Sequence, residues 1–564
     1  MKHILYILFF FTIYIIFPTT VFSQKIHLDV TAEKSISEGL KDSLSIPETF
    51  KDYNSLQNEV DLLPQKLQRL GYIESRLEKL TKRNDSTYLA NYFFGKKYLY
   101  IKVYYDTAFF SKKEIQQIAS EVTDTYFILP FETAEISLQK LNALKTEQGN
   151  AFASLNLTNL QTEEEYLSAT LALDSGKKRT LDSLVIKGYE KFPKSYLKYY
   201  AGVKTGKTFR KEKLKEQNTA INNLGFARTT KAPEVLFRKE TTTAYFYIEK
   251  QNNNLFDGIL GFATDEETQN LQFNGYVNLQ LNNNLNYGEQ LLINYKADGS
   301  DQQNFRVKAT LPYLFKTPFG ISAELKIFKR DSTFVTTEQQ ARVNYQINPV
   351  STAYGGYKAY ESSNLLDEVV VGNTVEDFNS KFFIAGASFL KLQDDTLFPI
   401  KTELSIETET GERELERATE NQFKLSVTAS TIFNLNYSNA IFIKNNTDIL
   451  FSETYITNEL FRFGGINSIR GFNENSIDAS LLSTLNTEYR YRFNQGLYIH
   501  SIIDFGYFQN QVLNLKQNLY SAGIGLGLQT KAGILKLNIA NGISEDQDFN
   551  FSNTKIHISL TSKF

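Results

Sequence analysis

The stretch Glu459–Phe472 reads ELFRFGGINSIRGF and separates two regions in which apolar and polar residues alternate. A stretch of this kind is typical of a loop that joins two β-strands. The paired glycines Gly464 and Gly465 permit a tight bend with positive φ, and Gly471 lets the backbone lie close to a neighbour. Arg470 is the single charge in the run FGGINSIRGF. We therefore predict that this loop presents Arg470 to an acidic partner.

A glycine-rich loop with one arginine also fits a purely structural turn, and two downstream segments bear on the choice. In residues 485–493 (LNTEYRYRF) the apolar side chains take one face of the predicted strand, and Glu488 lies on the other. In residues 497–507 (LYIHSIIDFGY) Asp504 lies on the polar face in the same way. If the apolar faces contact lipid, both acids face an enclosed lumen, where an arginine binds carboxylates in fork geometry.

Three patterns together resemble the BamA/TamA/FhaC superfamily of outer-membrane assembly and secretion barrels. They are G-G-x-x-S-I-R-G-F at Gly464–Phe472, N-x-E-x-R at 486–490 and D-x-G at 504–506. The resemblance implies a sixth loop that folds into the barrel, where Arg470 contacts Glu488 and Asp504 on strands twelve and thirteen. It leaves open whether Arg470 braces the wall or acts as a gating latch. The other residues of the implied motif are Gly464, Gly465, Ser468, Ile469, Gly471 and Phe472.

The composition narrows the class of protein. The chain has 564 residues, 41% hydrophobic content and a formal net charge of −2, which allows several domains and gives no basic excess for nucleic acid. The absence of cysteine excludes disulfides, thiol catalysis and thiolate metal sites. The 44 phenylalanines and 33 tyrosines supply aromatic side chains of the kind that form girdles at both membrane interfaces.

The N-terminus resembles a secretory signal. Lys2 precedes the apolar run Ile4–Phe17, and Val21–Ser23 precedes a predicted cleavage site after Ser23. A signal anchor is the alternative, but Pro18 ends a run that is short for a membrane helix. No later apolar run approaches the roughly twenty residues that a spanning helix needs. We therefore expect residues 1–23 to be a signal peptide, and any membrane-spanning part of the mature chain to be a barrel.

Residues 24–251 predict three α+β modules, at 24–97, 98–179 and 180–251. The third is the clearest, with the order strand, helix, helix, strand, strand (β-α-α-β-β) and a helix exit, NLGFA, that resembles the polypeptide-transport-associated (POTRA) domain. Exposed sheet edges of such modules accept an extended chain through backbone hydrogen bonds. The alternative is that the modules are only spacers.

Residues 252–564 alternate almost without helical pattern and predict a transmembrane antiparallel barrel of about 16 strands. In residues 271–282, for example, every second side chain is apolar. We expect short connections except for loop six, around 455–480, and the charged stretch Glu407–Glu420. The tail Lys555–Phe564 resembles the C-terminal signal of outer-membrane barrels, with Phe564 as its terminal aromatic residue.

An enzyme is not expected. The mature chain has three isolated histidines, His27, His500 and His557, and no nucleophile elbow, phosphate loop or metal-ligand spacing. We predict no catalytic residue, metal or cofactor. Glu488 and Asp504 do not form an acid/base pair, because an arginine between them holds both ionised.

The resemblance implies an outer-membrane protein with its N-terminal modules in the periplasm. It would capture unfolded polypeptides, contact outer-membrane lipid and accessory assembly subunits, and insert or transport clients, with no nucleic-acid partner. The first and last strands would meet at a seam that opens laterally. A two-partner secretion transporter for one exoprotein is an alternative, although such proteins usually carry two transport-associated domains and a plug helix. A passive channel or receptor is the other alternative.

Overall fold

The computed structural model describes residues 25–33, 38–163, 166–264, 271–298, 302–366, 374–530, 533–545 and 547–563. The predicted signal peptide, residues 1–23, and the terminal Phe564 lie outside the described residues. The chain divides into two compact units. One contains residues 1–180 with 208–211, and the other contains residues 181–207 with 212–564.

The first module is a four-stranded sheet in the order β2-β1-β4-β3. Helix α3 begins with a capping box, in which Asp52 accepts a hydrogen bond from the Ser55 backbone and the Ser55 side chain accepts one in return. Its apolar residues recur every three or four positions, so one face is fully buried against the sheet. The elements are β1 Ile26–Ala32, α2 Glu38–Leu44, β2 Thr49–Phe50, α3 Tyr53–Arg69, β3 Arg76–Lys82 and β4 Thr87–Phe93.

The second module is a five-stranded sheet in the order β6-β7-β5-β9-β8. The sequence interpretation did not include the hairpin β6–β7, which lies between the two helices in the chain. Its strand β7 places Phe127 and Leu129 in the module's core. The elements are β5 Tyr100–Tyr104, α4 Lys112–Ile115, β6 Glu121–Val122, β7 Tyr126–Pro130, α5 Phe131–Glu147, β8 Ser154–Thr162 and β9 Leu167–Asp174.

The third module follows the predicted order of elements, except that the strand expected before the last one is divided into two, β11 and β12. Strand β10 pairs in parallel with β13, and β11 and β12 pair antiparallel with the other side of β13. The first of its two helices is a five-residue π-helix, η1. The elements are β10 Ser183–Gly188, η1 Tyr196–Tyr200, α6 Lys211–Asn222, β11 Ala227–Thr229, β12 Glu234–Phe237 and β13 Thr242–Lys250. Each of the three sheets falls within one predicted module, whose exact boundaries stay predictions. Within the described residues, no helix combines the length and apolarity needed to cross a bilayer.

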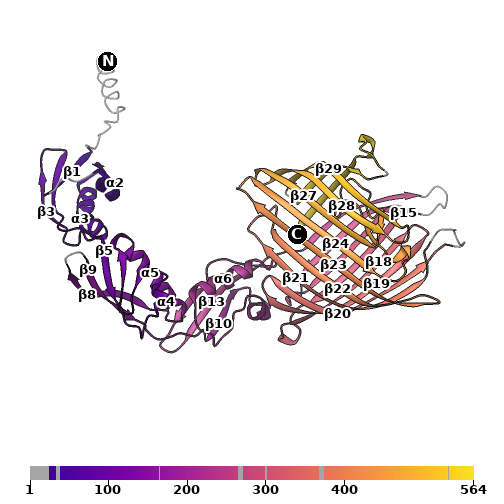
Figure 1. Cartoon of the computed structure of the whole chain (residues 1–564), viewed down its shortest axis with the longest axis horizontal. Coiled ribbons are helices and arrows are strands. Elements are labelled where there is room, and N and C mark those ends of the chain that lie inside the picture. The colour runs from indigo at the N-terminus through magenta and orange to yellow at the C-terminus, as the bar shows by residue number, and fades with distance from the viewer. Residues whose placement is uncertain are drawn as a thin grey trace, which may run out of the picture. The chain divides into compact units, whose positions relative to one another are not determined.

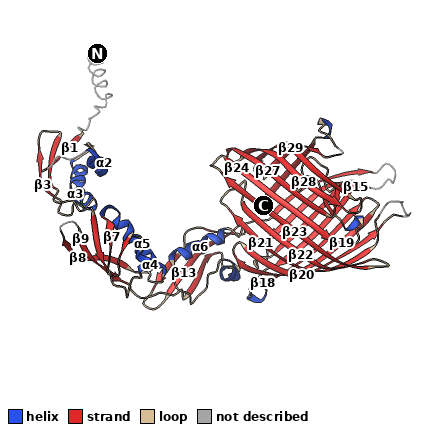
Figure 2. Cartoon of the chain, viewed as in Figure 1, coloured by secondary structure: helices blue, strands red, loops and turns tan. Residues whose placement is uncertain are grey.

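The C-terminal part is a closed antiparallel barrel, which confirms the predicted fold class (Figure 1). Figure 2 shows it as almost entirely strand. Sixteen strands of the described residues form it: β14 Leu255–Thr264, β15 Leu271–Asn282, β16 Gln290–Asp298, β17 Gln302–Leu311, β18 Phe319–Arg330, β19 Phe334–Asn348, β20 Ser351–Asn364, β21 Phe378–Leu392, β22 Ile400–Glu414, β23 Thr419–Asn434, β24 Asn439–Phe451, β27 Leu481–Asn494, β28 Leu497–Asn510, β29 Leu515–Gln529, β30 Ile534–Ile543 and β31 Lys555–Lys563.

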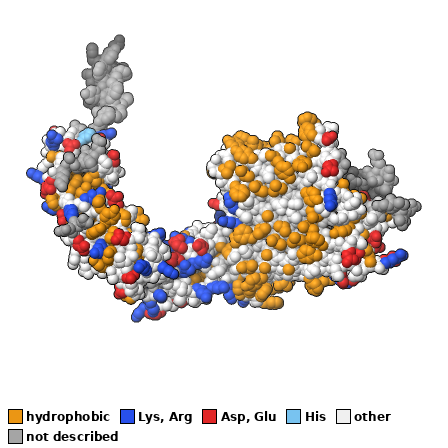
Figure 3. Space-filling model, viewed as in Figure 1, with side chains coloured by type: hydrophobic (Ala, Val, Ile, Leu, Met, Phe, Trp, Pro, Cys, Tyr) orange, Lys and Arg blue, Asp and Glu red, His pale blue; other side chains and the backbone are white. Residues whose placement is uncertain are grey.

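The two faces of the barrel wall differ in polarity. The outer surface carries exposed apolar side chains, which cover the visible face of the barrel in Figure 3. The inner face holds buried charged residues, including Glu324, Lys358, Glu409 and Lys424. A wall with lipid outside and a closed sheet of paired backbone groups requires this alternation.

One predicted connection is wrong. The charged stretch Glu407–Glu420 is not a long connection, because it forms the end of β22, a short turn and the start of β23. Glu407, Glu409 and Arg413 lie on one face of β22 and point into the lumen. There Glu407 and Glu409 both bind Lys358, at 2.9 and 2.5 Å. A cluster of charges looked like a solvated loop, but period two is the pattern of a strand with a polar inner face.

Tyrosines of the third module bind turns at one end of the barrel, within the same compact unit. The Tyr189 hydroxyl donates to Asn286 Oδ1 at 2.6 Å, and the Tyr196 hydroxyl donates to the Gly288 carbonyl at 3.0 Å. The Tyr196 ring also contacts the Tyr313 ring edge-on, with 4.7 Å between centroids. These contacts fix the last module against the barrel rim.

Candidate functional site

Loop six comprises residues 452–480, between β24 and β27. It contains a short 3-10 helix, η3 Thr457–Glu459, and a two-stranded hairpin of β25 Phe461–Phe463 and β26 Ile477–Ala479. The sequence predicted the loop but not the hairpin within it. The glycine-rich tip with Arg470 lies between the two hairpin strands.

The structure brings Arg470 together with Glu488 of β27 and Asp504 of β28. The guanidinium donates from Nε and Nη2 to the two oxygens of Asp504, at 2.8 and 2.5 Å, and from Nη1 to Glu488 at 2.5 Å. All three residues are buried, and the Asp504 side chain has no exposed area. Charge-assisted, bidentate bonds of this kind fix direction as well as distance.

In the structure the apolar and the acidic residues of β27 and β28 lie on opposite faces of the wall. Tyr489 and Ile503 are exposed on the outer surface, whereas the acids next to them in sequence face the lumen. Arg490 also points inward and binds Glu488 at 2.7 Å. Two arginines therefore oppose two carboxylates. This balance matters because an unpaired buried charge is strongly destabilising.

The glycines of the motif are required by space and by backbone geometry. Gly471 has φ +85°, and a Cβ there would lie 2.5 Å from the backbone nitrogen of Gly542 in β30. Gly464 and Gly465 have φ values of +116° and +86°; a Cβ would lie 2.2 Å from the Asn473 carbonyl oxygen at the first and 2.2 Å from the Glu474 carboxylate at the second. Gly464 and Gly471 therefore pack backbone to backbone, and all three positions have a φ that favours glycine.

The remaining motif residues anchor the tip. Ser468 Oγ accepts a hydrogen bond from the Gly464 backbone at 2.7 Å, and its carbonyl accepts one from Asn486 Nδ2 at 2.6 Å. Ile469 is fully buried and Phe472 nearly so, in a cluster between the loop and the inner wall. The alternating pattern of β28 contributes Gly506, where a Cβ would lie 2.9 Å from Ile469 Cδ1.

A second ion cluster, missed in the sequence, fixes the start of loop six. Arg413 of β22 has no exposed side-chain area and binds Glu459 at 2.5 Å and Glu420 at 2.8 Å. Gln422 of β23 donates to the other Glu459 oxygen at 2.7 Å. Arg413 and Glu459 are 46 residues apart in the chain, so neither alone indicates the other.

A third cluster fixes the hairpin. Arg330 of β18 binds both oxygens of Asp478 at 2.7 and 2.8 Å. Arg462 lies 3.8 Å from the same carboxylate and stacks over Phe328 at 4.3 Å. Loop six is thus bound to the barrel wall at three places: β18, β22, and the pair β27 and β28. The sequence did contain a signal for the second and third clusters: Arg413 of β22 and Arg330 of β18 are arginines on the inner face of a strand, where each needs an acidic partner.

The site offers no arrangement for metal chemistry. Among the described residues, no group of three or more His, Cys, Asp or Glu side chains is placed to hold a metal ion. His500 lies 3.9 Å from Glu488 and stacks on Tyr498, while His557 is on a different strand. The contacts that the site does make are ion pairs, by which Arg470 of loop six binds Glu488 of β27 and Asp504 of β28.

Known proteins share this architecture. The fold is similar to that of CdiB from Acinetobacter baumannii, with a TM-score of 0.51 and 11% identity over 97% of this chain and 93% of that chain. For CdiB from Escherichia coli the TM-score is 0.53 at 13% identity, over 90% of this chain and 98% of that chain. For BamA from Haemophilus ducreyi lacking POTRA domains 1-3, the TM-score is 0.49 at 16% identity, over 82% of this chain and 99% of that chain.

Sequence comparison gives the family. None of the curated protein sequences matches the chain. The model of the Omp85 superfamily domain matches residues 278–564, which is half of the chain and includes the loop-six motif and both acidic strands. The chain therefore belongs to the Omp85 superfamily of outer-membrane protein assembly and secretion factors, which are not enzymes.

Proposed function

We propose that this protein inserts β-barrel client proteins into the outer membrane through the seam between β14 and β31. As a member of the superfamily it is an outer-membrane barrel with periplasmic POTRA domains, and its clients are polypeptides. The proposal concerns the route that a client takes. The observation that carries it is the short pairing at the seam.

The seam is paired much less than its flanks. Strand β14 pairs with β15 over ten positions, Leu255 to Thr264, but with β31 only through Leu255 and Phe256 among the described residues. On its other side β31 pairs with β30 over seven positions. The edge of β14 from Asp257 onward thus has backbone groups available to another strand. Unpaired backbone groups are costly in lipid, so a client strand that adds there is stabilised.

Loop six argues against a route through the lumen. It is held by three ion clusters: those centred on Arg470 and Arg413 are buried, and the one centred on Arg330 is partly buried. Breaking a buried pair by leaving one partner uncompensated costs about 3–5 kcal/mol, and clearing the lumen would disturb all three clusters. In this proposal Arg470 braces the wall formed by β27 and β28, so that the seam is the part that moves.

The N-terminal modules would capture the client. Strand β3 of the first module and β8 of the second end their sheets, and among the described residues each pairs on one side only. An extended chain adds to such an edge through backbone hydrogen bonds, which depend little on its side chains. This suits a factor that receives many unfolded clients.

Quantitative proteomics of outer-membrane and secreted proteins after depletion tests the function. The proposal expects a broad loss of β-barrel proteins, restored by the wild-type gene. Loss of a single secreted protein with an intact barrel population would instead indicate a secretion transporter, and no change in either would indicate a channel or receptor.

A disulfide across the seam tests the route. The chain has no cysteine, so Leu255→Cys with Lys563→Cys creates one defined cross-link between partners in the register. Client insertion is expected to stop under oxidising conditions and to recover on reduction. The control is Ser388→Cys with Ser405→Cys, which joins β21 to β22 away from the seam. Normal insertion with a closed seam would contradict the proposal.

A further inference from the structure

The three N-terminal modules differ at one sheet edge, the free side of the first strand. In the first module β2 pairs antiparallel with β1, and in the second β7 pairs antiparallel with β5 over five residues. The pairing with β2 covers only the first two residues of β1, whereas β7 covers all five residues of β5. In the third module β10 pairs with β13 on one side. On the other side Leu181, which precedes β10, exchanges backbone hydrogen bonds with Gly206 and Lys207, and among the described residues no strand pairs with Ser183–Gly188 there.

Burial follows this difference. In β5, Ile101 and Val103 are 2% and 0% exposed, because β7 adds Phe127 and Leu129 beside them. The corresponding inward residues of β10, Leu184 and Ile186, stay partly exposed. Apolar side chains on a sheet face gain stability when a neighbouring strand covers them. The third module therefore has space where the second has a strand.

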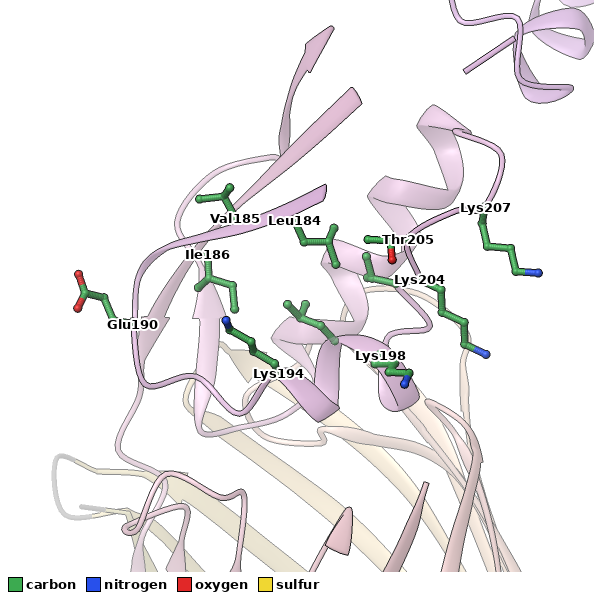
Figure 4. A pocket seen from close by; sticks show the side chains of 11 residues that line it. Leu184, Val185, Ile186, Glu190, Lys194, Lys198, Lys204, Thr205 and Lys207 are labelled. Atoms are coloured by element: carbon green, nitrogen blue, oxygen red, sulfur yellow. The ribbon is translucent and has the colours of Figure 1, made fainter. Parts of the chain in front are cut away.

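That space is a groove of about 790 Å³. Figure 4 shows Leu184 and Ile186 on the groove side of β10, with Val185 on the other side of the strand. Leu197 of η1 and Val203 form the rest of the apolar floor, and both are buried. The groove thus offers alternate apolar contacts next to a strand edge, which is the arrangement that binds extended peptides.

The rim of the groove is basic. Lys194, Lys198, Lys204 and Lys207 line it and are exposed, and Glu190 is the single acid among the lining residues. An occupant with acidic residues near its ends would bind the lysines, and a basic occupant would be repelled. Backbone hydrogen bonds at a strand edge do not distinguish one extended chain from another, so the four lysines of the rim provide the selectivity for acidic chains.

We propose that β10 binds an extended client segment as an antiparallel strand, apolar at alternate positions and acidic at its flanks. The orientation follows β2 and β7, which both run antiparallel to the first strand of their modules. The alternation follows Phe127 and Leu129 of β7, and the acidic flanks complement the four lysines. This inference rests on the proposed function only in taking the segment to come from a client.

Peptide binding to the full-length protein in lipid nanodiscs tests the charge requirement. The probe is a fluorescein-labelled peptide with the β7 sequence Tyr126–Leu129 between two pairs of aspartates, and its matched control carries lysines in place of the aspartates. The double variant Lys204→Glu with Lys207→Glu should bind the acidic peptide with at least tenfold lower affinity than the wild type, and the basic peptide with higher affinity. Both lysines are exposed, so the fold is expected to tolerate the change. Equal affinity of the two peptides for the wild type would overturn the proposal.

Cross-linking tests the edge and the direction. Lys187→Cys places one thiol on β10, and Leu236→Cys places one on the opposite edge strand, β12; both positions are exposed. Peptides with a cysteine at successive positions should form a disulfide with β10 in an antiparallel register. Preferential cross-linking to β12, or a parallel register on β10, would contradict the proposal.

Peptide binding and client insertion fail separately. If the acidic peptide binds β10 as expected but depletion leaves barrel proteins unchanged, the groove is a peptide-binding site and the proposed insertion function is wrong. If depletion removes barrel proteins but the peptide does not bind β10, the insertion function is supported and the proposal that clients bind this groove is wrong.

Discussion

Arg470 binds Asp504 through its side chain and its backbone together. Nε and Nη2 of the guanidinium donate to the carboxylate, and the Arg470 backbone nitrogen donates to Oδ2 at 3.1 Å. The carboxylate therefore positions the main chain of the loop tip as well as the cation. A lysine at this place would keep the charge but lose the planar fork that binds two carboxylates.

Arg470→Ala is expected to destabilise the folded barrel by about 3–5 kcal/mol, because Glu488 and Asp504 lose a buried partner. Arg470→Lys should recover less than half of that loss. The measurement is the urea dependence of the folded fraction, seen by heat-modifiable migration on gels. The control is Arg417→Ala, an exposed arginine in the turn after β22. Equal midpoints for the Arg470 and Arg417 variants would show that the cluster adds no stability.

Arg413 and Glu459 should behave as a coupled pair. Arg413→Met and Glu459→Gln are each expected to destabilise the barrel. The double variant should lose less than their sum, because Glu459 is no longer a buried charge when Arg413 is removed; the loss of the Arg413–Glu420 contact is common to the Arg413 single variant and the double variant. A double-mutant cycle on the same unfolding assay measures this coupling. Strict additivity would mean that the 2.5 Å contact contributes nothing of its own.

Gly471→Ala should impair loop placement although the change is one methyl group. The residue has φ +85° and its new Cβ would lie 2.5 Å from a backbone atom of β30. Backbone strain of this kind costs on the order of 1–3 kcal/mol, and the contact adds to it. Gly355→Ala in β20 is the matched control, since its nearest contact would be 3.7 Å. Protease cleavage within loop six of intact protein should increase in the first variant alone.

The second module should lose stability in acid through Glu114. Burial by itself raises the pKa of this carboxyl, but hydrogen bonds from Lys145, the Ser111 backbone and Gln148 lower it to about 2 from the ordinary 4.5. The depressed pKa means that the stabilisation is complete above pH 4.5 and disappears as the pH falls toward 2. The pattern is consistent with a carboxylate that accepts several hydrogen bonds.

Amide hydrogen exchange in helix α5, corrected for the intrinsic rate, measures this effect. Glu114→Gln should reduce protection at pH 6, and this reduction should shrink as the pH falls below 4.5 and be nearly absent at pH 2. A difference between variant and wild type that stays constant across this range would contradict the assignment.

Gly288→Ala should loosen the last module from the barrel rim. Gly288 has φ +77°, and a Cβ there would lie 2.1 Å from the Tyr196 ring, so the ring must move away from Tyr313. Exchange protection of η1 is expected to fall while that of α6 is retained. Unchanged protection of η1 would show that these tyrosine contacts do not hold the module.

The sequence predicted what local periodicity encodes. The parity of β27 and β28 placed Glu488 and Asp504 on one face, and the barrel and its strand number followed from the same alternation. The pairing of Arg413 could not be predicted, because its partner Glu459 is distant in sequence and lies in a loop without periodicity. Strands β2 and β6 have two residues each, too few for any pattern to appear.

The strand β7 was missed for another reason. Its run YFILP lies between two helices and directly precedes α5, so no turn residues separate it from the helix that follows. A short apolar run has the same appearance in a helix and in a buried strand. Only the pairing with β5 distinguishes them.

The position of the β10 edge affects the kinetics of delivery. Among the described residues no strand pairs with Ser183–Gly188 on the side away from β13, and Tyr189 and Tyr196 of the same module bind the barrel rim. A segment bound there is tethered beside the barrel, so its encounter with β14 becomes intramolecular. The rate of transfer is then first order and independent of the amount of client in the periplasm.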